Sequence, residues 1–188
     1  QKVYPFFAKL GSAEGEGGER EGLGHISEYM QDADLEIKNE SVLTSAVEMV
    51  NDLPLTQSDV KGDIYEYLLS KLTTAGINGQ FRTPRHIIDL MVAMTAPTPQ
   101  DEICDPACGT AGFLVAASEY VRDNHPAALT NAQQREHFHR SMFHGYDFDS
   151  TMLRIGSMNM LMHGVESPDI RYRDSLSEGA SGDAEKYT

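Results

Sequence analysis

The chain has 188 residues, with 40% hydrophobic and 23% charged side chains and a formal net charge of −14 at pH 7. These values indicate an ordinary water-soluble globular protein of one domain, or of one domain with a helical appendage, and the acidic charge argues against a large nucleic-acid footprint on this segment. No apolar run reaches the ~20 residues of a membrane span, no signal peptide is visible and two cysteines are too few for a zinc site, so we expect a cytoplasmic protein with no membrane or metal.

The first part of the chain is predicted to be a flexible segment followed by helices. Residues 1–24 are acidic and glycine-rich, and the stretch "GSAEGEGGEREGLG" offers almost nothing to bury, so we expect this segment to be flexible. Two amphipathic helices follow, "SVLTSAVEMVNDL" before Pro54 and "SDVKGDIYEYLLSKLT" with Ser58 or Asp59 as its cap. Residues 25–79 are therefore expected to form a helical region that packs as its own unit beside the rest.

Residues 80–188 change to an alternation of strands and helices. Thr83 is expected to cap the helix "RHIIDLMVAMTA", with Pro84 as its first residue. Three strands are predicted after this helix, "EIC", "MFHGYDFD" and "DIRYRDSL". Between the first two strands lie the helix "GFLVAASEYVRDN" and the polar segment "HPAALTNAQQREHFHRS", which is an insertion or a short helix. The Met-rich helix "STMLRIGSMNMLMHG" lies between the second and third strands. This order predicts an α/β domain with a parallel sheet and right-handed crossovers. The Met-rich helix is apolar on more than one face, which indicates burial on several sides, either wholly on the sheet or partly against a partner.

Polar residues gather at the predicted carboxyl ends of these strands, where parallel α/β sheets bind their ligands. They are the loop "DPACGTAG" after the first strand, Asp147 with Asp149 after the second, and Asp174 after the third. Small residues in the loop would let a ligand approach the backbone, and the acids could accept hydrogen bonds from a ribose and from an adenine amine. Each feature also has a purely structural explanation, in which Gly109 and Gly112 shape a turn, the second-strand acids cap a helix, and Asp174 lies in a solvated turn.

The loop distinguishes between two classes of ligand. A dinucleotide-binding loop has the pattern G-x-G-x-x-G, whereas here Ala107 stands at the first glycine position, before Gly109 and Gly112. The loop also begins with Asp105 and Pro106, and a carboxylate at that place disfavours a pyrophosphate but favours an ammonium or sulfonium group. This chemistry points to S-adenosylmethionine.

The loop and the motif upstream of it together resemble a family of enzymes. "DPACGTAGFL" resembles the S-adenosylmethionine motif of amino-methylating DNA methyltransferases, D-P-x-C-G-[ST]-G-G-F, with Ala111 where the second glycine is usual. "GQFRTPRHIIDLMV" is similar to the partner motif G-x-[FY]-x-T-P that precedes it in these enzymes. "GDIYEYLL" and "HGYDFDSTMLRIGSMNMLMHG" are similar to segments of the modification subunit of type I restriction–modification systems. The resemblance covers roughly residues 40–176 and implies a Rossmann-like methyltransferase sheet.

The resemblance also implies which residues bind the cofactor. It implies that Thr83 and nearby backbone hold the methionine carboxylate of S-adenosylmethionine, and that Asp105 faces its ammonium group. Asp147 would accept hydrogen bonds from the ribose, Asp174 would lie near the adenine ring, and Arg82 is given no role. The full implied cofactor-binding set is Phe81, Thr83, Pro84, Asp105, Pro106, Ala107, Gly109, Gly112, Phe113, Asp147, Phe148 and Asp174.

The same resemblance implies the activity of the intact protein. That protein would transfer a methyl group from S-adenosylmethionine to the exocyclic amine of adenine in duplex DNA, beside a specificity subunit and a restriction subunit. The family's catalytic motif, [ND]-P-P-[FY], is missing because the chain has no Pro-Pro pair, so we expect that motif beyond Thr188 and expect this chain alone to be inactive. Because it begins with Gln1, we also expect a piece of a longer protein. The alternative is a non-catalytic nucleotide-binding or scaffold module, and a dehydrogenase is disfavoured by the missing glycine.

Overall fold

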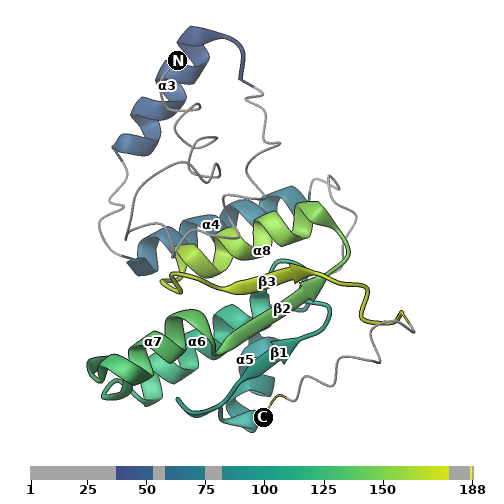
Figure 1. The fold of residues 1–188 in the computed structure, drawn as a ribbon. Helices are drawn as coiled ribbons and strands as arrows, with labels where there is room; N and C mark the ends of the chain where they lie inside the picture. Colours follow the sequence, from purple (N-terminus) through teal and green to yellow (C-terminus); the bar gives the residue numbers. More distant parts are fainter. Residues whose placement is uncertain (1–36, 53–57, 75–81, 178–186, 188) are drawn as a thin grey trace, which may run out of the picture.

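The computed structural model describes residues 37–52, 58–74, 82–177 and 187 (Figure 1). Its helices and strands are, in chain order, α3 (Glu40–Asn51), α4 (Ser58–Thr74), α5 (Arg85–Thr95), β1 (Ile103–Asp105), α6 (Gly112–Asn124), the short 3-10 helix η2 (Ala128–Thr130), α7 (Ala132–Arg140), β2 (Phe143–Asp147), α8 (Ser150–Met162) and β3 (Asp169–Tyr172). The segment predicted to be flexible, residues 1–24, lies outside the described residues. None of the described helices combines the length and the hydropathy needed to cross a membrane.

In the described part of the chain, three parallel strands form a sheet with the spatial order β1-β2-β3. Ile103 of β1 pairs with Phe143 of β2, and His144 of β2 pairs with Asp169 of β3. The strand–helix alternation and the parallel pairing confirm the predicted α/β class. Because all three strands run in the same direction, their carboxyl ends share one edge of the sheet.

The hydrophobic core lies between the sheet and the helices that connect its strands. α6 and α8 contact each other as well as the strands, and α5 packs along α6. Leu114, Val115 and Val121 of α6 are at most 1% exposed and belong to one buried cluster with Phe143 and Ile170 of the sheet. Burying a side chain of this size contributes about 1.5–3 kcal/mol. This cluster fixes α6, and with it the loop that precedes α6.

α8 lies between the sheet and α4 (Figure 1). Its Met, Leu and Ile side chains are all buried or half-buried, and Met152, Leu153 and Met160 are at most 2% exposed. This position explains why the helix is apolar on more than one face, since it contacts β2 and β3 as well as α4. Packing within the chain therefore accounts for the buried part of the Met-rich pattern, and a partner contact at the half-buried Met158, Leu161 and Met162 remains a prediction.

α4 docks on α8 through close packing. A Cβ added at Gly62 would lie 2.4 Å from Nε2 of the buried His163, so a glycine is needed for this close approach. Nearby, the Tyr65 hydroxyl donates to the Ile155 carbonyl at 3.3 Å, and burial raises the pKa of Tyr65 to about 12. α3 differs from α4, since none of its residues is buried. The division at residue 80 remains a prediction, although α4 contacts the helix that covers the sheet.

The start of α5 corrects one prediction. We expected Thr83 to cap this helix and Pro84 to be its first residue, but the helix begins at Arg85 and Pro84 is the capping residue. Within the described residues, no side chain makes a capping hydrogen bond to the first turn. The reason is that Pro84 has no polar side chain, and Thr83 lies one residue too early for its hydroxyl to take the cap position. The Thr83 hydroxyl therefore has no part in starting α5.

Candidate functional site

The three predicted acids lie at or near the carboxyl edge of the sheet. Asp105 is the last residue of β1, Asp147 is the last residue of β2, and Asp174 follows the end of β3 by two residues. The first two are brought together next to the glycine loop that follows β1. Asp174 is exposed, and its carboxylate accepts from the Leu176 N–H at 3.0 Å, which is the arrangement of a solvated turn.

Hydrogen bonds within the glycine loop and from the loop to β2 give the loop its shape. Asp105 Oδ1 accepts from the Ala107 N–H at 3.1 Å, and the Cys108 N–H donates to the Tyr146 carbonyl of β2 at 2.9 Å. Gly109 has a φ of +53°, and beyond its chain neighbours no described atom lies within 4 Å of the place of a Cβ. Backbone conformation rather than crowding therefore favours glycine here. The open space leaves this part of the backbone accessible to a ligand.

Asp147 connects the glycine loop to the turn after β2. One of its carboxylate oxygens accepts from the Gly109 N–H at 3.0 Å, and the other accepts from the Asp149 N–H at 2.9 Å. Helix capping, the structural alternative for these acids, is performed by Asp149, whose carboxylate accepts from the Thr151 N–H at the start of α8. Each oxygen of Asp147 retains a second lone pair, so this residue can shape the loop and still accept from a ligand hydroxyl.

Asp105 lies in a negatively charged environment. Burial raises the pKa of Asp105, the Ala107 N–H opposes this by donating to the carboxylate, and the charge of Asp147 raises the pKa further. A cation beside the two carboxylates would favour the ionised form of Asp105, whereas a phosphate would add another negative charge. The electrostatics of the site therefore suit a ligand that carries a positive group.

A cavity of about 150 Å³, which we call the loop cavity, lies against the glycine loop. Half of the predicted cofactor residues line it, namely Thr83, Asp105, Ala107, Gly109, Gly112 and Phe113. Arg82, Ile88, Cys108 and Thr110 also line it, although none of them was predicted to bind the cofactor. The only sequence signal that could have predicted Arg82 in the cavity wall is its position next to Thr83 in the upstream motif.

Of the other predicted residues, those that the structure describes do not line the loop cavity. Pro84 lines a neighbouring cavity of about 280 Å³, which shares Arg82 and Thr83 with the loop cavity. Phe148 is 72% exposed, and Phe81 lies outside the described residues. Asp147 and Asp174 do not line the loop cavity either, and for all twelve residues a role in cofactor binding remains a prediction.

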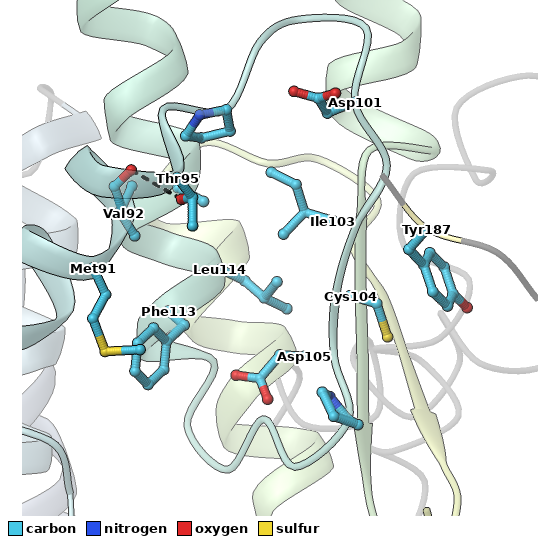
Figure 2. Close-up of a pocket in the computed structure, with 13 residues that line it drawn as sticks. Met91, Val92, Thr95, Asp101, Ile103, Cys104, Asp105, Phe113, Leu114 and Tyr187 are labelled. Atoms are coloured by element: carbon cyan, nitrogen blue, oxygen red, sulfur yellow. Dashed lines mark hydrogen bonds between the residues drawn. The ribbon is translucent and has the colours of Figure 1, made fainter.

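A larger cavity of about 680 Å³ is lined by residues of α5, β1 and α6 (Figure 2). Its walls are mainly apolar, with Met91, Ile103 and Leu114 among them. Asp105 and Phe113 line both this cavity and the loop cavity, so the two spaces meet near the end of β1. Pro106, a further predicted residue, lines only the larger of these two cavities. Each cavity has two charged residues in its lining, Asp101 and Asp105 in the larger one and Arg82 and Asp105 in the loop cavity.

A parallel sheet whose first strand leads through a glycine loop into a helix, with an acid at the end of the next strand, is a Rossmann-like nucleotide-binding arrangement. Comparison with models of protein families identifies the family within this fold class. The family model for N-6 DNA Methylase matches residues 56–187. The chain belongs to the N-6 DNA methylase family, as its paired sequence motifs predict.

Curated relatives of the chain include methylase subunits of type I restriction enzymes. The chain is 31% identical over 160 residues to the EcoEI methylase subunit of Escherichia coli, which covers 83% of this chain and 32% of that protein. It is 38% identical over 109 residues to the EcoKI methylase subunit of Escherichia coli strain K12, which covers 56% and 20%. Among solved structures, a modification subunit from Vibrio vulnificus YJ016 matches with a TM-score of 0.70 and 28% identity, over 93% of this chain and 35% of that one. The chain thus spans about a third or less of the length of these relatives.

Proposed function

We propose that this chain is the cofactor-binding part of the modification subunit of a type I restriction–modification system. The whole protein transfers a methyl group from S-adenosylmethionine to the exocyclic amine of adenine in DNA, with a specificity subunit and a restriction subunit as partners, in the cytoplasm. The observation that carries the proposal is the pair of carboxylates, Asp105 and Asp147, beside a glycine loop with an accessible backbone. Family membership and the methylase relatives support the type of reaction.

The residues of the site fit S-adenosylmethionine, which supplies a methyl group on a positively charged sulfur. Asp105 accepts from the ammonium group of the cofactor, and Asp147 accepts from its ribose while it holds the Gly109 N–H. Thr83 and the first turn of α5 would hold the methionine carboxylate, since among the described residues no side chain caps the N–H groups of that turn. The negative charge of the chain, −14, assigns most of the DNA contacts to the rest of the protein or to its partner subunits.

An NMR titration of the isotope-labelled chain with S-adenosylmethionine tests the proposed cofactor. We expect the amide signals of Gly109, Thr110 and Gly112 to shift, while the signals of α3 remain in place. NAD⁺ is the matched control, because a dinucleotide-binding loop would bind it and a methyl-donor site would not. Shifts produced by NAD⁺ and not by S-adenosylmethionine would contradict the proposal. A chain that binds neither ligand would favour the scaffold alternative.

A further inference from the structure

Glu66 of α4 joins segments that lie far apart in the sequence. Its Oε2 accepts from Arg82 Nη2 at 2.8 Å, and its Oε1 accepts from Asn159 Nδ2 at 2.7 Å. The same Asn159 amide donates to the Thr110 carbonyl of the glycine loop at 2.9 Å. One carboxylate therefore links α4 directly to the segment before α5 and, through Asn159 of α8, to the glycine loop.

Both links end in the wall of the loop cavity. Arg82 and Thr83 line this cavity from the segment before α5, and Thr110 lines it from the glycine loop. Glu66 does not line the loop cavity but the neighbouring cavity of about 280 Å³. Glu66 thus lies behind the wall, where it can set the distance between the two wall segments without touching a ligand in the loop cavity.

The surroundings of Glu66 strengthen its hydrogen bonds. Asn159 is 0% exposed, and the side chains of Arg82 and Glu66 are 23% and 25% exposed. Burial alone would raise the pKa of Glu66, but the hydrogen bond from Asn159 and the charge of Arg82 lower it overall, with a further contribution from His163. Glu66 is therefore ionised at neutral pH. Charge-assisted hydrogen bonds that are shielded from water are stronger than neutral, exposed ones.

α4 has other contacts that hold it against α8. Gly62 packs against His163, and the Tyr65 hydroxyl donates to the Ile155 carbonyl. Neither contact leads to the loop cavity, whereas both hydrogen bonds of Glu66 do. Docking of α4 alone therefore does not account for the place of this carboxylate.

We propose that Glu66 is a positioning residue that holds the Arg82–Thr83 segment and the Thr110 segment at the spacing that the methyl-donor cofactor requires. The inference rests on the proposed function for the identity of that cofactor. α4 is then part of the cofactor site, although none of its residues with a described side chain lines the loop cavity.

The test compares Glu66→Gln with Tyr65→Phe in the full 188-residue chain. Glu66→Gln keeps the size of the side chain but removes its charge, and its one amide oxygen can accept from only one of the two donors, Arg82 and Asn159. Tyr65→Phe removes one hydrogen bond from the same helix contact and leaves the cavity wall linked. For each variant, hydrogen exchange measures the opening of amides 109–111 without ligand, calorimetry measures affinity for S-adenosylmethionine, and thermal unfolding measures stability.

We expect Glu66→Gln to speed exchange at amides 109–111 and to weaken cofactor binding about tenfold, the effect of losing one charge-assisted hydrogen bond. Tyr65→Phe should change neither quantity by more than about twofold, since a neutral hydrogen bond contributes less. Unchanged exchange in Glu66→Gln, or an equal loss of affinity in both variants, would overturn the proposal.

The two parts of the inference fail in different ways. If the unsubstituted chain does not bind S-adenosylmethionine, the proposed function of the chain fails, but the exchange rates still decide whether Glu66 holds the wall. If Glu66→Gln does not fold, Glu66→Asp keeps the charge but shortens the side chain, so that it can no longer reach both Arg82 and Asn159. Faster exchange at amides 109–111 in Glu66→Asp would then support the positioning role, and unchanged exchange would overturn it.

Discussion

Asp147→Ala removes two hydrogen bonds at once, and the structure indicates how much stability is lost. The carboxylate accepts from the Gly109 N–H at 3.0 Å and from the Asp149 N–H at 2.9 Å. Hydrogen bonds to a charged group contribute about 1.5–3 kcal/mol each. All three residues are half-buried, so water can partly replace the lost acceptor. We therefore expect the free energy of unfolding to fall by about 2–3 kcal/mol, below the sum of two such bonds, as measured by urea denaturation.

The same variant tests the proposed cofactor contact. If Asp147 also accepts from the ribose, calorimetry should show S-adenosylmethionine binding about tenfold more weakly to Asp147→Ala. Asp149→Ala is the matched control, because it removes the cap of α8, which costs about 1 kcal/mol, and leaves the Gly109 contact in place.

Two results would refute this reasoning about Asp147. Equal affinities in Asp147→Ala and Asp149→Ala would remove Asp147 from the cofactor site. An Asp147→Ala variant as stable as the unsubstituted chain would show that the glycine loop does not depend on the two hydrogen bonds.

Three further predictions concern stability. Gly62→Ala should lower the melting temperature despite the higher helix propensity of alanine, because the new Cβ would lie 2.4 Å from the His163 ring. Adding His163→Ala should restore part of the loss, whereas a melting temperature raised by Gly62→Ala would contradict this contact. Ala111→Val should lower the free energy of unfolding, measured by urea denaturation, by more than about 2 kcal/mol, because Ala111 is fully buried and has a φ of +60°. Ala111→Gly should stay within about 1 kcal/mol of the original chain. Equal effects of the two substitutions would refute the argument from backbone strain. The hydrogen bond to Asp169 raises the pKa of His144. The stability that this hydrogen bond contributes is therefore complete below the unfolded pKa of about 6.5 and is lost as the pH rises through the folded pKa. Urea denaturation at about pH 5.5 and about pH 8.5 should show this loss in the original chain and not in His144→Gln.

Local patterns in the sequence predicted the elements on which the site is built. The bounds of α6 agree with the predicted helix because a glycine turn begins it and its apolar spacing is continuous. The start of α5 was misplaced because Thr83 and Pro84 form a typical cap sequence, and only the backbone conformation of Pro84 decides which of the two is the cap. Such errors of one residue arise where two neighbouring residues both suit the same position.

The link from α4 to the site could not be predicted from the sequence. Glu66 and Asn159 are separated by 93 positions, and Glu66 and Arg82 by 16. Each of these polar residues, taken alone, is typical of a solvated helix face or a loop. Their meeting depends on how α4 packs across α8, which is set by Gly62 and the apolar contacts rather than by the polar residues themselves.

The position of α8 between the sheet and α4 has a consequence for folding cooperativity. α4 meets α8 at Ile155, Asn159 and His163. The departure of α4 would therefore expose buried and half-buried side chains of α8 to water together. α4 and the sheet should therefore unfold as a single cooperative unit, with one calorimetric transition. A truncated protein that starts after α4 should bind a dye for exposed hydrophobic surface and associate with itself, even though the truncation keeps every strand of the described sheet.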